Sequence, residues 1–277
     1  KKKYLEFLNN KIIQKDKEPS YYLYQSNQNN IDYTGIIVAA STREYLNGSI
    51  KKHEKTINKR EKLFSEYLSK IGFNADPVLL AYKSNKEIQK IICLVQKRRA
   101  EYEFTTSDKT LHKLWVISNN KEIQNISNRF KSINSLYIAD GHHRSASSAR
   151  LSKIKNSNCF MSMLIDEKQL NVFSFNRVIK NTINIKEIDL LKKLKETFTI
   201  IKIQEIEFNS NFKNEILLIT KSNSFRLIAK EGTYNNDLLS ILPTSILSNN
   251  ILQPIFKMDD NSKEINYING KIPNNKI

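Results

Sequence analysis

Hydrophobic positions along the chain follow a helical period in some segments and a strand period in others. Apolar residues three and four positions apart predict amphipathic helices, and short apolar runs between Asn, Gly and Pro predict strands. The predicted helices are a segment that Asn58 caps and Gly72 ends, then Lys86–Gln96, Lys121–Phe130, Lys186–Thr197 and Pro243–Leu252. The predicted strands are Tyr21–Gln25, Thr34–Ala40, Pro77–Tyr82, Leu111–Ile117, Leu136–Ala139, Cys159–Ile165, Val172–Phe175, Thr199–Ile203, Glu215–Thr220, Phe225–Ala229 and Glu264–Ile268.

Helices and strands that intersperse without a regular βαβ period predict an α+β fold, with a mixed sheet and packed helices. The 277 residues are enough for one large domain or two small ones. We expect a core domain over residues 1–178 and a second α+β subdomain over residues 179–277. In the segment after Asn58, apolar residues follow one another at helical spacing and predict a helix; they are Leu63, Phe64, Tyr67, Leu68 and Ile71.

The segment LYIADGHHRSASSAR, residues 136–150, predicts a strand, a tight turn and a helix. Asp140 is suited to cap this helix, and Gly141 allows a ligand to approach the backbone closely. His142, His143 and Arg144 then crowd the first turn, where positive charge is disfavoured by about 0.3–1 kcal/mol per residue. A bound anion removes this conflict, since the helix N-terminus and the side chains would all donate to it.

The simpler alternative is that Asp140 pairs with Arg144 and that the two histidines are surface residues. The combination of strand, glycine and misplaced charges favours a functional site, with phosphate as the expected anion.

A second group of charged residues lies at KKHEKT, residues 51–56. Lysines and His53 surround Glu54, so the ionised form of this carboxylate is favoured. A carboxylate beside a phosphate site can act as the base in transfer from a nucleotide to a hydroxyl, with His53 and Thr56 shaping the loop. By itself, the motif also fits a solvated charged loop.

Metal chemistry is the competing use of the histidines. The spacings HExxH and CxxC are absent, so no protein-held metal site is predicted. A Mg²⁺ ion that accompanies a nucleotide needs only one or two carboxylates and stays open. His112 lies in a predicted strand and fits a core position, and Cys93 and Cys159 lie in apolar settings that predict buried, reduced thiols.

The net charge of +17 indicates a basic surface that attracts anions. Nine of the 45 cationic residues are Arg and the Lys residues are scattered, which argues against a nucleic-acid groove, although nucleic-acid binding stays a minority alternative. No apolar run approaches the roughly 18 residues of a membrane span, so we expect a cytoplasmic protein with no membrane partner.

The motifs HExT and ADGHHR resemble the domain of unknown function 1015 family. Further stretches that carry this resemblance, in family order, are YYLYQ, TGIIVAAS, NKREKLFSEYLSKIGFNADPVLLAY, LHKLWVI, FSFNRVIK and ILSNNILQPIF. The ADGHHR corner is also similar to the phosphate-binding motif of the ParB/sulfiredoxin superfamily, which includes ADP-dependent free-serine kinases. This resemblance implies a ParB/sulfiredoxin-like nucleotide-binding core in which Gly141, His142, His143 and Arg144 contact phosphates and Glu54 stands where a kinase has its base.

The leading hypothesis is a nucleotide-dependent phosphotransferase, similar to a serine kinase, that acts on a small hydroxyl compound with ADP or ATP as the nucleotide. Glu54 and His53 are its catalytic candidates. The expected ligand-binding residues are Asp140, Gly141, His142, His143, Arg144, Thr56 and Arg177. The alternatives are a non-catalytic, nucleotide-gated binding module of the ParB kind and a metal-assisted phosphoesterase.

Overall fold

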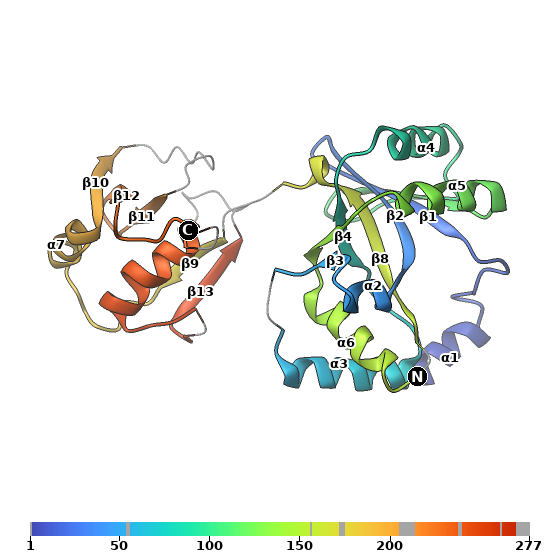
Figure 1. Ribbon diagram of the computed structural model, residues 1–277, viewed down its shortest axis with the longest axis horizontal. Coiled ribbons are helices and arrows are strands. Elements are labelled where there is room, and N and C mark those ends of the chain that lie inside the picture. The colour runs from blue at the N-terminus through green and yellow to red at the C-terminus, as the bar shows by residue number, and fades with distance from the viewer. Residues whose placement is uncertain are drawn as a thin grey trace. The chain divides into compact units, whose positions relative to one another are not determined.

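The computed structural model describes residues 2–53, 56–155, 157–171, 175–204, 214–237, 240–260 and 262–269. The chain divides into two compact units, residues 1–171 and 172–277 (Figure 1). The sequence-based boundary at 178 would leave most of β9 (Phe175–Ile179) in the first unit. However, β9 pairs with β13 (Ile265–Asn269) near the other end of the second unit, and the boundary therefore falls before this strand.

The first unit is built on an eight-stranded sheet with the order β3-β7-β4-β8-β2-β1-β6-β5. Its strands are β1 (Tyr21–Gln28), β2 (Ile31–Ser41), β3 (Ile50–Lys51), β4 (Val78–Tyr82), β5 (Tyr102–Thr105), β6 (Leu111–Ile117), β7 (Leu136–Asp140) and β8 (Cys159–Asp166). Its helices are α1 (Lys2–Asn9), α2 (Thr42–Leu46), α3 (Asn58–Ile71), α4 (Lys86–Gln96), α5 (Asn120–Lys131), α6 (His142–Ser152) and the 3₁₀ helix η1 (Glu167–Gln169).

The sheet is mixed, which confirms the predicted α+β class. β3 runs parallel to β7 and β4 runs parallel to β8, and the remaining neighbours are antiparallel. Figure 1 shows α4 beside α5 at one end of this unit and α3 beside α6 at the other.

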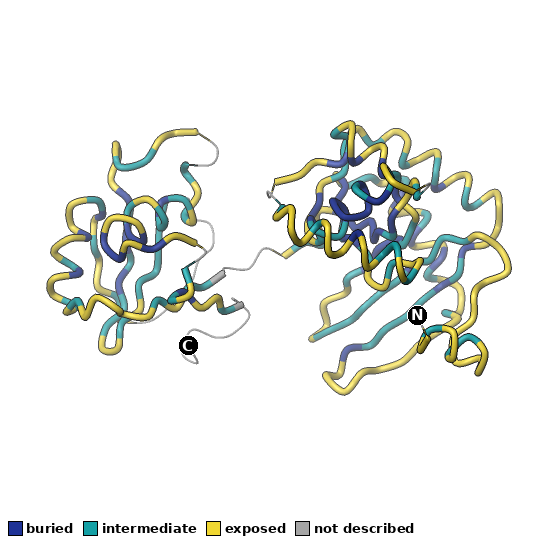
Figure 2. Tube along the Cα trace, turned by 90° about the horizontal axis from the view of Figure 1, so that it is seen from below, coloured by how far each residue is buried: buried dark blue, intermediate teal, exposed yellow. Residues whose placement is uncertain are grey.

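One hydrophobic core joins the sheet to its helices, and its buried residues lie inside the unit (Figure 2). Leu23, Ile36 and Leu80 are fully or almost fully buried on the strands, and Ile88 of α4 and Ile126 of α5 pack against them. Burial of such side chains contributes about 1.5–3 kcal/mol each. The core thus fixes the strands whose ends carry the candidate site.

The second unit has a three-stranded antiparallel sheet, β10-β12-β11, and the pair β13-β9. Its remaining elements are α7 (Glu187–Thr197), β10 (Phe198–Ile203), β11 (Glu215–Ile219), β12 (Ser224–Ala229), α8 (Pro243–Leu247) and the π-helix η2 (Ser248–Phe256). Leu194, Phe198, Leu227 and Leu252 form the centre of a separate core.

The buried position of α3 is a serine rather than one of its large apolar residues. Ser65 is its buried residue, while Leu63, Phe64 and Tyr67 are exposed. The reason is its partner: α3 packs against α6, whose inner face consists of Ser and Ala, and close packing of two such helices favours small residues at the contact. Gly72 ends α3 in the left-handed conformation, as predicted, but Ile57 rather than Asn58 occupies the N-cap position.

The expectation that both cysteines are buried is wrong. Cys93 and Cys159 are both exposed free thiols, because each lies at a position of its helix or strand that turns away from the core.

Among the described residues, no helix combines the length and the apolar character needed to cross a membrane.

Candidate functional site

The two charged motifs of the first unit lie at the ends of adjacent parallel strands. Ile50 of β3 pairs with Leu136 of β7, and Lys51 pairs with Tyr137. The carboxyl ends of parallel neighbours reach the same edge of a sheet, so the residues that follow β3 and those that follow β7 are brought together. More than eighty residues separate the two segments along the chain.

Contact between the motifs is made by two histidine rings. The ring centroids of His53 and His142 are 4.3 Å apart, and the ring planes meet at 83°, an edge-to-face arrangement. His142 is buried, with 6% of its surface exposed, whereas His53 is exposed. Beside them the ammonium of Lys52 lies 4.1 Å from the centroid of the Tyr45 ring, within the range of a cation–π contact.

Thr56 and the first turn of α3 are linked to α6 as well. Thr56 donates a hydrogen bond to Glu61 of α3. Arg150 of α6 donates to Asn58 at 2.9 Å and lies 4.0 Å from Glu61. Glu54, the predicted base, and Lys55 lie outside the described residues. His53 therefore contacts α6 directly, and Thr56 is connected to α6 through Glu61.

Tyr45 of α2 completes the buried side of this region. It is 7% exposed, and burial raises the pKa of its hydroxyl, with a further contribution from the nearby Glu61 carboxylate and an opposing one from a hydrogen bond with Ser145. Tyr45 therefore stays a neutral hydrogen-bonding group at physiological pH.

The turn into α6 depends on Gly141. Its φ of 98° lies in the left-handed region that favours glycine, and a Cβ at this position would lie 3.1 Å from Nε of Arg144. Gly141 is the N-cap residue, and its carbonyl accepts the first helical hydrogen bond, from Ser145, at 3.0 Å. The expectation that Asp140 caps the helix is thus wrong, because Asp140 is the last residue of β7 and binds a side chain instead.

That side chain is Arg144. Its guanidinium donates to the carboxylates of Asp140 and Asp76 and to the carbonyl of Pro77. These contacts use three of the five N–H groups of a guanidinium, and about one third of the side chain is exposed. The pairing of Asp140 with Arg144 is the simpler alternative that the sequence left open, so the structure gives Arg144 a part in holding the turn around Gly141.

The small residues of α6 are buried rather than turned toward a ligand. Ser145, Ala146, Ser147, Ser148 and Ala149 are all inside the unit, and the three serine hydroxyls donate to main-chain carbonyls of the same helix. Their small size serves the close packing of α6 with α3. The helix N-terminus itself keeps the first-turn N–H groups that have no intrahelical acceptor.

The other predicted site residues divide between the two units. His143 is half-buried, and its Nδ1 has no hydrogen-bond partner in the described part of the chain. Arg177 belongs to the second unit, where it pairs with Asp260 at 3.3 Å. Within the described residues, no group of three His, Cys, Asp or Glu side chains is arranged to hold a metal ion. His112 is half-buried on β6 and bonds through Nδ1 to the Tyr24 hydroxyl at 2.7 Å.

Comparison with known proteins identifies one family and one similar structure. The family model described as "Protein of unknown function (DUF1015)" matches residues 1–248. A solved structure of a mutant free serine kinase in complex with AMP is similar with a TM-score of 0.37 and 15% sequence identity, and the match covers 92% of this chain and 72% of that chain. No curated protein matches the chain.

Proposed function

The chain belongs to the DUF1015 family of proteins of unknown function, and we propose that it transfers a phosphoryl group from ADP or ATP to a hydroxyl group of a small molecule. The observation that carries this proposal is the contact of His53 with His142 at the N-terminus of α6. It joins a segment suited to bind phosphate to the segment that precedes the candidate base.

Phosphate binding rests on the first turn of α6. The N–H groups of this turn and the positive end of the helix dipole favour an anion, and His142 and His143 add side-chain donors. Lys51 and Lys52, at the end of β3, contribute positive charge from the neighbouring strand. Arg144 acts as a positioning residue, since its contacts with Asp140 and Asp76 hold the turn at Gly141 in place.

The carboxylates at the corner suit an ion that comes with the nucleotide. Asp76 and Asp140 both bind Arg144, and 70% of each side chain is exposed. Mg²⁺ in nucleotide sites takes one or two carboxylates, and these two would hold it and help to neutralise the phosphate charge.

Proton removal from the acceptor hydroxyl is assigned to Glu54, the residue that follows His53 in the sequence. A positioned carboxylate can take this proton as the hydroxyl oxygen attacks phosphorus, and the bond to the leaving phosphate oxygen of the nucleotide breaks. Lysines on both sides of Glu54 in the sequence favour its ionised form.

The test uses the full chain, radiolabelled ADP or ATP and a panel of small hydroxyl compounds that includes serine. We expect Glu54→Gln to reduce turnover by about 10²–10⁴-fold and to leave nucleotide affinity nearly unchanged, because the substitution removes the base but keeps the size of the side chain. Glu66→Gln, which alters an exposed carboxylate of α3, is the matched control and should change neither quantity.

Two results would replace the proposal. Nucleotide binding without transfer to any acceptor would make the protein a nucleotide-gated binding module. Equal losses of binding and turnover in Glu54→Gln would make Glu54 a structural or ion-binding residue rather than the base.

A further inference from the structure

α3 turns its large apolar side chains toward solvent. Leu63 is 63% exposed and Tyr67 is 54% exposed, although Ser65 between them is buried. Successive residues of an α-helix are about 100° apart around its axis, so the residues two positions before and after Ser65 lie almost opposite to it. Phe64, which is also exposed, widens this outer stripe. An apolar stripe of this kind ordinarily faces a core, whereas here it lies on the surface of the first unit.

Two neighbouring segments enlarge the apolar area, and Figure 1 shows α1, α3 and α6 at the same end of the first unit. Phe73, just after α3, is exposed, and its ring centroid lies 4.6 Å from that of Tyr4 on α1. Ile154, just after α6, is exposed as well, and the next residue, Lys155, donates a hydrogen bond to the carbonyl of Ser69 on α3. We call this area the α3 surface, which consists of Leu63, Phe64, Tyr67, Phe73 and Ile154. Contiguous exposed apolar areas mark interaction sites.

The charge around the α3 surface is positive. α3 has four cationic and two anionic side chains. One of its two carboxylates, Glu61, already accepts a hydrogen bond from Thr56 and lies 4.0 Å from Arg150. The cations of α3 are all exposed; they are Lys59, Arg60, Lys62 and Lys70. Lys153 and Lys155, on both sides of Ile154, are exposed too. A partner that fits this surface is therefore apolar and anionic at once.

A membrane interface with anionic lipids has both properties, and we propose that the α3 surface binds one. Helices that lie in the plane of an interface carry Leu and aromatic residues on one side and Lys or Arg on the other. The apolar side chains of α3 enter the interface, and the lysines extend their stems to keep their ammonium groups near the lipid phosphates. A second copy of the chain fits less well, because it would bring like charges together.

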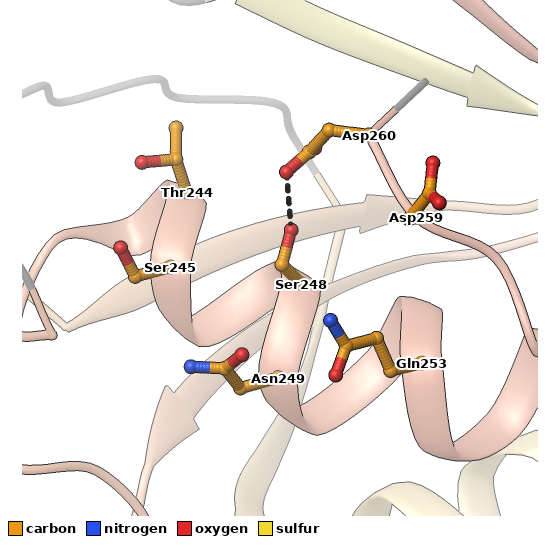
Figure 3. A pocket seen from close by; sticks show the side chains of 7 residues that line it. All are labelled: Thr244, Ser245, Ser248, Asn249, Gln253, Asp259 and Asp260. Atoms are coloured by element: carbon orange, nitrogen blue, oxygen red, sulfur yellow. Dashed lines mark hydrogen bonds between the residues drawn. The ribbon is translucent and has the colours of Figure 1, made fainter. Parts of the chain in front are cut away.

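This binding mode needs no segment that crosses the membrane. The expectation of no membrane partner followed from the lack of an apolar run of about 18 residues, whereas an interfacial helix needs only one apolar side. The cavity of the second unit, about 410 Å³, gives a contrast. It is lined by hydroxyl, amide and carboxylate side chains, and among them Ser248 donates to Asp260 at 2.7 Å (Figure 3). Such groups would lose hydrogen bonds to water in lipid, so the experiment changes residues of the first unit.

The test measures cosedimentation of the full chain with vesicles of phosphatidylcholine alone and with vesicles that also contain phosphatidylglycerol. We expect binding to the anionic vesicles and a loss of about tenfold in Leu63→Ser, because the leucine side chain no longer leaves water. The matched control is Leu94→Ser on α4, at the other end of the unit, where the leucine is 61% exposed. It should leave binding unchanged. Both substitutions keep the net charge of +17, so adsorption by charge alone cannot separate them.

A second pair of variants tests the lysines. Lys62→Gln combined with Lys70→Gln removes two cations beside the α3 surface and should weaken binding to the anionic vesicles by at least about tenfold. Lys86→Gln combined with Lys97→Gln removes two exposed cations at the ends of α4. This control has the same net charge, and we expect it to bind as the unchanged chain does.

Fluorescence shows whether the surface enters the lipid. Tyr67→Trp should emit at shorter wavelengths on anionic vesicles, while the chain's own tryptophan, Trp115, is buried and gives a constant background. Equal binding to the two kinds of vesicle, equal losses in Leu63→Ser and Leu94→Ser, or an unshifted emission of Tyr67→Trp would overturn the proposal. The α3 surface would then be left to a protein partner, such as an acidic amphipathic helix. None of these results depends on whether the first unit transfers phosphate.

Discussion

The rings of His53 and His142 pack edge to face, with 4.3 Å between their centroids. This contact links the segment after β3 to the helix start after β7. Edge-to-face ring pairs contribute about 0.5–1.5 kcal/mol beyond the burial of their surface. The pair therefore helps to hold the two halves of the candidate site together in the absence of a ligand.

A double-mutant cycle measures this link. We expect His53→Ala and His142→Ala to show a coupling free energy of about 0.5–1.5 kcal/mol in urea unfolding. The control cycle combines His142→Ala with His112→Ala. His112 lies on β6, far from β7 in the strand order, and is hydrogen-bonded to Tyr24 and Thr106 instead. Its coupling should be close to zero. Additive effects in the first cycle would show that the two rings contribute independently.

Gly141 supplies a second test of the corner. Gly141→Ala places a Cβ in a left-handed backbone conformation, which costs about 1–2 kcal/mol, and brings it to 3.1 Å from the Arg144 side chain. Gly72 at the end of α3 has a similar φ of 86°, but a Cβ there meets no atom within 4 Å in the described part of the chain. Gly72→Ala is therefore the matched control for the backbone cost alone. We expect Gly141→Ala to lower the free energy of unfolding by more than Gly72→Ala does, as measured by urea denaturation.

The exposed cysteines lead to a prediction that differs from the one based on sequence. Cys93 on α4 and Cys159 at the start of β8 should both react with iodoacetamide in the native protein, giving two modified thiols per chain at pH 8 by mass spectrometry. Neither thiol lies among the candidate site residues, so Cys93→Ser and Cys159→Ser should keep nucleotide binding unchanged. Protection of either thiol until the chain is unfolded would contradict its exposed position.

Secondary structure was the part of the fold most accessible from sequence. Long periodic segments such as α4 and β6 have the predicted bounds, because their hydrophobic period is unambiguous. β3 was not predicted because two residues carry no period, although its parallel pairing with β7 brings the two candidate motifs together. The apolar spacing of α3 predicted a helix correctly, whereas the burial of Ser65 was not predictable because it depends on the small residues of α6.

The residues of the corner were also predictable in part. The strand, the glycine and the helix at 136–152 follow from local pattern, and His53 and His142 were both proposed as site residues. Arg144 was expected to bind a ligand. No pattern in the sequence predicts its pairing with Asp76, which lies 68 positions earlier. Contacts of this kind are set by the order of strands in the sheet, which local patterns do not specify.

A buried hydroxyl on β4 provides the last prediction. Tyr82 is fully buried, and its ring meets that of Phe130 edge-to-face with centroids 5.1 Å apart. Its hydroxyl has no hydrogen-bond partner within the described ranges. A buried hydroxyl without a partner costs about 1–3 kcal/mol relative to its hydrated state. Tyr82→Phe keeps the ring and removes this cost, so we expect the free energy of unfolding to rise by about 1 kcal/mol.

The matched control is Tyr24→Phe, which removes a hydroxyl that is hydrogen-bonded to Nδ1 of His112 at 2.7 Å. It should lower the free energy of unfolding by about 0.5–1.5 kcal/mol, so the two identical substitutions are expected to have opposite signs. Burial raises the pKa of Tyr82 above its ordinary value of 10, and the nearby Asp166 carboxylate adds to this effect. Its folded form therefore stays protonated where the unfolded form ionises, and the wild type loses stability relative to Tyr82→Phe as the pH rises above 10. Urea unfolding at pH 7 and pH 10.5 measures both effects, and a Tyr82→Phe chain less stable than the wild type at pH 7 would show that the hydroxyl is hydrogen-bonded after all.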